Sequence, residues 1–161
     1  MDEALSVDEV LEVAEQIERN GAKFYRCAAA LCEDPNISAL FVQMGQWEAR
    51  HVQVFKEMRT CLSKQKWDIG DLGTDRAPSA RALAGLAIFS RQARPGEGLT
   101  GRETRAEVFR KAIEKEKESI VYYAGLKDFV PTQRERQTVE DIIQEEMKHV
   151  RILMQSLERL E

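Results

Sequence analysis

Two stretches of this sequence, WEARHVQVF at residues 47–55 and EEMKHVRIL at residues 145–153, decide how the chain folds. In each stretch a Glu is followed three residues later by a His: Glu48 and His51, then Glu146 and His149. The chain has 161 residues and only two His, and both lie in this spacing. Because three residues along an α-helix advance about 4.5 Å on nearly one face, each Glu and His can bind one ion together.

The offset of 98 residues between these stretches also relates two others, ERNGAKFY at 18–25 and EKEKESIVYY at 114–123. Glu18 and Tyr25 recur there as Glu116 and Tyr123. All four glutamates fall on apolar seams in which every third or fourth residue is hydrophobic, as in helices that face a bundle interior. The sequence therefore predicts an internal repeat that places four acids at one level of a core.

The spacing of helix signals predicts an all-α fold. Ser6 and Glu9 form a capping box, and Pro35 and Pro131 interrupt helical stretches. Short turns make two antiparallel hairpins, and the long connection between them is typical of a bundle with a crossover. We expect one domain over 1–161, an antiparallel four-helix bundle with hairpins at 6–63 and 102–161, helices at 6–32, 36–63, 102–129 and from 132 onward, and a connection at 64–101 that contains a short helix near 79–90.

Four buried carboxylates need counter-charges. In the first hairpin Glu18 should lie level with Glu48 and His51, and the second hairpin should repeat this arrangement. Alone, the acids would repel one another and lose hydration, whereas two divalent cations cancel four negative charges. Oxygen-rich coordination with one nitrogen per ion suits iron or manganese, as in di-iron and di-manganese carboxylate bundles. We expect two iron ions, with manganese or zinc as alternatives in a purified sample.

The two repeated tyrosines, Tyr25 and Tyr123, have two interpretations. They are either core aromatics or donors of hydrogen bonds to a ligand carboxylate of the opposite hairpin. We favour the hydrogen bonds because a buried hydroxyl needs a partner.

In these four motifs the chain resembles the rubrerythrin branch of the ferritin-like superfamily. The resemblance covers about 120 residues and implies six metal ligands: Glu18, Glu48, His51, Glu116, Glu146 and His149. Two features depart from the family. These 161 residues contain no Cys-x-x-Cys pair of a rubredoxin domain, and Ser119 stands where rubrerythrins carry an additional glutamate. The corresponding position of the first helix is Gly21.

The resemblance implies a non-haem di-iron oxidoreductase that reduces hydrogen peroxide or dioxygen, with catalysis through the metals held by the six ligands. Gly21 and Ser119 would leave room for the oxidant. A ferritin-type ferroxidase that handles iron is the first alternative, and a bundle with purely structural metals is the second. The reductase needs a separate electron-donor protein, and we expect a homodimer in which segments can be exchanged between chains.

Composition excludes several other classes of protein. The net charge of −4 argues against a nucleic-acid binder, and no apolar run is long enough to cross a membrane. The acidic start has no signal-peptide pattern, so we expect a cytoplasmic protein. Cys27, Cys32 and Cys61 are expected to be free thiols, with Cys32 and Cys61 at opposite ends of the bundle.

Overall fold

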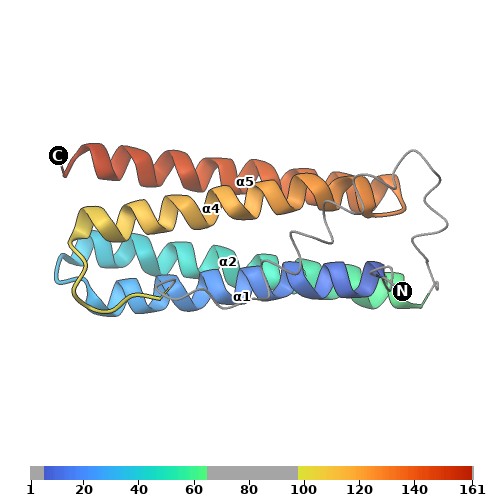
Figure 1. The fold of residues 1–161 in the computed structure, drawn as a ribbon, viewed down its shortest axis with the longest axis horizontal. Coiled ribbons are helices and arrows are strands. Elements are labelled where there is room, and N and C mark those ends of the chain that lie inside the picture. Colours follow the sequence, from blue (N-terminus) through green and yellow to red (C-terminus); the bar gives the residue numbers. More distant parts are fainter. Residues whose placement is uncertain (1–5, 65–97, 161) are drawn as a thin grey trace, which may run out of the picture.

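The computed structural model describes residues 6–64 and 98–160, and these residues form four α-helices and no strand (Figure 1). The helices are α1 (Val7–Leu31), α2 (Pro35–Ser63), α4 (Arg105–Phe129) and α5 (Gln133–Glu158). The all-α prediction of a four-helix bundle is therefore confirmed. The short helix predicted near 79–90 lies outside the described residues.

The helices form two hairpins that lie side by side (Figure 1). Helix α1 packs chiefly against α2, and α4 packs chiefly against α5. Helix α4 runs antiparallel to α1 and in the same direction as α2, so the end of α2 and the start of α4 lie at opposite ends of the bundle (Figure 1). A short turn cannot join them, which explains why the long connection of 64–101 is needed.

Capping residues set the helix boundaries. Ser6 forms the predicted capping box with Glu9, because its side chain accepts from the Glu9 amide while the Glu9 carboxylate accepts from the Ser6 amide. Helix α4 begins at Arg105, three residues later than predicted, since Thr104 forms a second capping box with Glu107. This Thr-x-x-Glu pattern is visible in the sequence and marks the start of α4 more accurately than the predicted boundary at residue 102.

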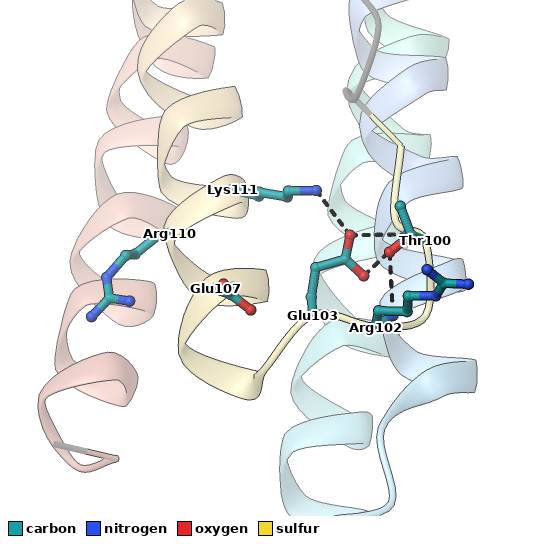
Figure 2. Close-up of a pocket in the computed structure, with 6 residues that line it drawn as sticks. All are labelled: Thr100, Arg102, Glu103, Glu107, Arg110 and Lys111. Atoms are coloured by element: carbon teal, nitrogen blue, oxygen red, sulfur yellow. Dashed lines mark hydrogen bonds and ion pairs between the residues drawn. The ribbon is translucent and has the colours of Figure 1, made fainter.

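A carboxylate fixes the turn that leads into α4 (Figure 2). Glu103 accepts hydrogen bonds from the backbone amides of Thr100 at 2.9 Å and Gly101 at 3.0 Å, and Lys111 donates to it at 2.9 Å. Gly101 has a φ of 81°, a left-handed conformation that glycine adopts without a steric penalty. These contacts hold the chain in the bend that directs α4 along the bundle.

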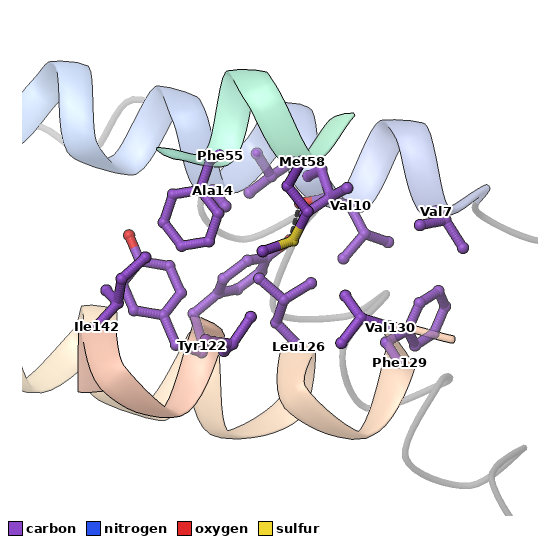
Figure 3. Close-up of a cluster of buried hydrophobic side chains, with 14 of the residues drawn as sticks. Val7, Val10, Ala14, Phe55, Met58, Tyr122, Leu126, Phe129, Val130 and Ile142 are labelled. Carbon is purple, nitrogen blue, oxygen red and sulfur yellow. Dashed lines mark hydrogen bonds between the residues drawn. The ribbon is translucent and has the colours of Figure 1, made fainter. Parts of the chain in front are cut away.

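The apolar seams meet inside the bundle as two hydrophobic clusters. One contains Phe55, Met58 and Tyr122 and is closed by Phe129 (Figure 3), and the other contains Phe41 and its neighbours. The four glutamates predicted to lie on these seams are buried, as are Tyr25 and Tyr123. The glutamates and histidines of the seams lie between the two clusters, so apolar side chains separate them from water at both ends of the bundle.

An ion pair ties α1 to α2 at the surface and predicts a pH effect. Arg59 donates to both carboxylate oxygens of Asp8, at 2.7 and 2.9 Å, and this hydrogen bonding lowers the pKa of Asp8 below 3.8 against the opposing effect of burial. Because the folded pKa is lowered, the pair stabilises the protein above about pH 4, and the stabilisation disappears as the pH falls through the folded value. Asp8→Asn should cost about 0.2–1 kcal/mol at pH 7 and less at pH 2 in urea unfolding. An equal cost at both pH values would contradict this.

None of the helices in the described residues is long and apolar enough to cross a membrane. The three cysteines are free; Cys32 directly follows α1 and Cys61 lies in the last turn of α2, so these two sit at opposite ends of the bundle as predicted.

Candidate metal centre

The structure brings all six predicted ligand residues together in the middle of the bundle. Helices α1 and α4 contribute one glutamate each, and α2 and α5 contribute a Glu-x-x-His pair each. All six side chains are buried: Glu18, Glu48, His51, Glu116, Glu146 and His149. A layer of four carboxyl groups and two imidazoles therefore lies between the two apolar clusters.

The layer divides into two groups of potential ligand atoms, and within each group all the atoms lie within 4.8 Å of one another. Glu18 and His51 belong to the first group only, whereas Glu48 and Glu146 belong to both. The second group is completed by Glu116 and His149. Each group therefore combines three residues of one hairpin with a carboxylate from the opposite hairpin, a sharing of ligands that the sequence did not predict.

The buried oxygen and nitrogen atoms of this layer are arranged so that they could bind two cations. Five buried atoms of the layer make no hydrogen bond of regular geometry, although they approach one another closely: Oε2 of Glu18, Oε1 of Glu48, Nδ1 of His51, Oε2 of Glu116 and Oε1 of Glu146. Buried polar atoms are rarely left unpartnered. Cations at the two positions would be partners for all five atoms at once, and four carboxylates would neutralise two divalent ions.

Burial dominates the acid–base behaviour of the carboxyl groups. It raises the pKa of Glu18 and of Glu48 above 4.5, and the charges of neighbouring glutamates add to the effect. Burial and a hydrogen bond with Glu146 raise the pKa of Glu116 to about 8. Burial also raises the pKa of Glu146, but hydrogen bonds from Glu116 and both histidines outweigh it and lower the value. The carboxyl layer thus holds protons that a metal ion would replace.

The imidazoles respond to the same carboxylates. Burial lowers the pKa of both rings, but hydrogen bonds to Glu146 and Glu18 raise that of His51 to about 11. Hydrogen bonds to Glu116, Glu146 and Glu48 raise the pKa of His149 to about 12. Both Nδ1 atoms face the carboxylates, at 2.7 Å for His51 and 3.0 Å for His149 from oxygens of Glu146.

The two repeated tyrosines reach across the bundle. The Tyr25 hydroxyl donates to Oε1 of Glu116, and the Tyr123 hydroxyl donates to Oε1 of Glu18. Burial, then the adjacent glutamate, raises the pKa of each phenol well above 10, which keeps each hydroxyl protonated as a donor. Each tyrosine occupies one oxygen of a glutamate and leaves Oε2, the unpartnered atom, facing the centre.

This geometry predicts a selective effect of Tyr123→Phe. Removing the hydroxyl frees Oε1 of Glu18 and should weaken metal binding about tenfold, because groups that orient ligands typically contribute 10–100-fold to metal affinity. The neighbouring Tyr122 is a matched control, since its buried hydroxyl donates to the Val10 carbonyl at 2.8 Å, outside the layer. Tyr122→Phe should lower the free energy of unfolding by about 1 kcal/mol and leave metal affinity unchanged. Calorimetric metal titrations and urea unfolding of both variants would test this, and equal affinities would contradict it.

Gly21 lies against the ligand layer, and the Glu48 side chain occupies the space beside it. A Cβ atom at Gly21 would overlap with Oε2 of Glu48 and lie 3.2 Å from its Cδ. The expectation that Gly21 leaves room for an oxidant is therefore wrong, because the Glu48 side chain fills that room. At the equivalent position of α4, Ser119 is buried and donates to the carbonyl of Lys115 at 3.0 Å.

Gly21→Ala should therefore displace Glu48 and reduce metal affinity about 10-fold or more, as for the loss of a group that orients a ligand. The fold should persist, since a carboxylate at the end of a flexible side chain can move aside. Gly45→Ala is the matched control, because its Cβ would meet its nearest neighbour, Cβ of Tyr25, at an ordinary 3.5 Å. That variant should gain up to about 1 kcal/mol in helix stability and bind metal normally. Equal metal titrations for the two variants would contradict the role of Gly21.

Sequence reasoning missed two residues beside the layer. Oε2 of Glu145 lies 2.9 Å from Nε2 of His51, and the indole of Trp47 stacks on the His149 ring at 4.9 Å between centroids. Trp47 and Glu145 are equivalent positions of the 98-residue repeat. Both could have been identified from the sequence, because the residue before the repeated glutamate differs between the two motifs: it is Trp47 in WEARH and Glu145 in EEMKH.

Comparisons with known proteins agree with this architecture. The sequence profile of the Rubrerythrin family matches residues 9–157. A solved structure from Thermotoga maritima, assigned as a ferritin-like diiron-carboxylate protein, superimposes with a TM-score of 0.71. The two are 23% identical, and the alignment covers 100% of both chains. Among curated protein sequences, none matches this chain.

A four-helix bundle with a long crossover and a buried layer of carboxylates and imidazoles defines the ferritin-like class of fold. Within that class, the match over almost the entire chain shows that this protein belongs to the rubrerythrin family.

Proposed function

We propose that this protein is a non-haem di-iron oxidoreductase that reduces hydrogen peroxide or dioxygen. The observation that carries the proposal is the pair of ligand groups that share Glu48 and Glu146, because two ions held by common carboxylates can act together on one substrate. The diiron-carboxylate assignment of the similar structure from Thermotoga maritima supports iron as the metal.

The proposed ligands are Glu18, His51, Glu116 and His149 at one position each, with Glu48 and Glu146 at both. Two ferrous ions bound there would supply one electron each, and with two protons these electrons convert one hydrogen peroxide into two waters. The protein's own residues hold the site ready. Tyr123 and Tyr25 orient two glutamates, and the apolar clusters on either side exclude water.

A stopped-flow experiment tests the reaction. Protein loaded anaerobically with two Fe(II) per chain is mixed with hydrogen peroxide or with dioxygen, and the ferric absorbance is followed. The proposal expects oxidation of both irons, with one peroxide consumed per two irons. Turnover of many irons per chain would instead favour the ferritin-type ferroxidase. If neither oxidant acts while chelation lowers the melting temperature, the metals are structural.

Continued turnover needs a source of electrons. We propose a separate protein as the donor. We also propose a homodimer, to be checked by light scattering. A large hollow shell in that measurement would favour iron storage.

A further inference from the structure

Because of the internal repeat, the two halves of the bundle can be compared residue by residue. The second half, displaced by 98 residues, supplies an equivalent for every proposed ligand and for the tyrosine that orients each outer glutamate. Glu48 and Glu146 are common to both groups. Ligand identity alone therefore predicts two metal positions of similar affinity.

The residues that contact the imidazoles break this equivalence. Nδ1 of His51 faces the carboxylates, and its other ring nitrogen, Nε2, lies 2.9 Å from Oε2 of Glu145. Glu145 is on α5, whereas His51 is on α2, so the contact crosses between the two hairpins. The His51 side chain is buried, while that of Glu145 is 49% exposed.

The equivalent contact to His149 is of a different chemical kind. The residue at the equivalent position is Trp47, and its indole lies nearly parallel to the His149 ring, with 10° between the planes. Within residues 6–64 and 98–160, no carboxylate contacts Nε2 of His149, because all its carboxylate contacts are made by Nδ1. An indole face fixes the plane of the ring but accepts no N–H hydrogen bond in this stacked geometry.

A carboxylate that accepts from the distal N–H of a ligand histidine fixes its tautomer and makes the metal-binding nitrogen more basic. Loss of such a partner typically costs 10–100-fold in metal affinity. The Glu145 carboxylate can accept such a hydrogen bond from His51, whereas the Trp47 indole cannot accept one from His149. We propose that Glu145 is a positioning residue for His51 and that the two metal positions are unequal, the tighter one lying at Glu18 and His51. This inference rests on the proposed function, because it assumes that the layer binds two ions.

The test is a titration of the metal-free full chain with Co(II), followed by the visible d–d absorption. Wild-type protein should bind two ions in resolved steps whose dissociation constants differ by about 10–100-fold. Glu18→Ala should remove the tighter step and Glu116→Ala the weaker one, which assigns the steps to positions. Each of these variants lacks one equivalent ligand of the repeat, so each controls for the other.

Glu145→Ala should weaken the tighter step about 10–100-fold, so that the two steps converge, and should leave the weaker step in place. Glu145→Gln keeps an acceptor oxygen and should recover part of the loss. Glu158→Gln makes the same change of charge on the exposed end of α5 and should leave both steps unchanged. The metal-free variants should melt at the wild-type temperature, since Glu145 is exposed.

The outcomes separate this inference from the proposed function. Two equal steps in wild-type protein, an unchanged titration of Glu145→Ala, or an equal weakening of both steps would overturn the positioning role while leaving a dinuclear site. No binding of Co(II) by wild-type protein would overturn the proposed function, and the inference with it.

Discussion

Glu146→Ala is expected to abolish the binding of a pair of metal ions. Glu146 belongs to both ligand groups, and its two oxygens lie 2.7 Å from Nδ1 of His51 and 3.0 Å from Nδ1 of His149. No other residue contacts both imidazoles at these distances in the described part of the chain. Removing it takes a ligand from each position and leaves three other carboxyl groups that cannot neutralise two divalent ions.

We expect the stoichiometry to fall from two ions per chain to at most one, with the remaining affinity weakened at least about 100-fold. This is the upper range for residues that merely orient a ligand, and it corresponds to roughly 2.7 kcal/mol. Metal analysis after dialysis, together with calorimetric titration, would measure both quantities. Glu158→Ala is the matched control, because it removes a carboxylate from the exposed end of the same helix and should retain two ions at unchanged affinity. Two tightly bound ions in Glu146→Ala would remove the basis for the shared-ligand site.

Removing the metal is expected to lower the melting temperature by about 10–20 °C. An ion present at about 100 times its dissociation constant adds about 2.7 kcal/mol to stability, so two ions add about 5 kcal/mol. For a chain of this length each kcal/mol shifts the melting temperature by about 2–4 °C. The physical reason is the repulsion and lost hydration of four buried carboxyl groups, which the ions compensate.

Differential scanning calorimetry with and without a chelator would measure the shift. Glu48→Gln serves as the control, since it replaces a carboxyl group whose pKa is raised by burial and by the charges of Glu18 and Glu116 with a neutral amide. Its metal-free form should melt no lower than metal-free wild type, and its response to metal should be much smaller. Equal melting temperatures of loaded and stripped wild-type protein would show that the layer does not bind metal.

Local sequence determined most of the bundle. Ser6 with Glu9 and Asp34 before Pro35 start helices through contacts within one turn, and such contacts can be predicted from spacing alone. The seam periodicity located Glu18, Glu48, Glu116 and Glu146 in the interior for the same reason, because one helix face is fixed by a period of 3.6 residues. Helix α4 was misplaced by three residues only because its Thr104 capping box was overlooked.

Contacts between helices could not be predicted in this way. The sharing of Glu48 and Glu146 between both ligand groups, the filling of the space beside Gly21 by Glu48, and the approach of Glu145 to His51 all join residues of different helices. Their geometry depends on the rotation and depth of one hairpin against the other, which the packing of the two apolar clusters sets. The sequence by itself thus determined which side chains enter the interior and at what level. Only the tertiary structure decided which of them meet, because helical periodicity orients a residue within its own helix and carries no information about its partner across the bundle.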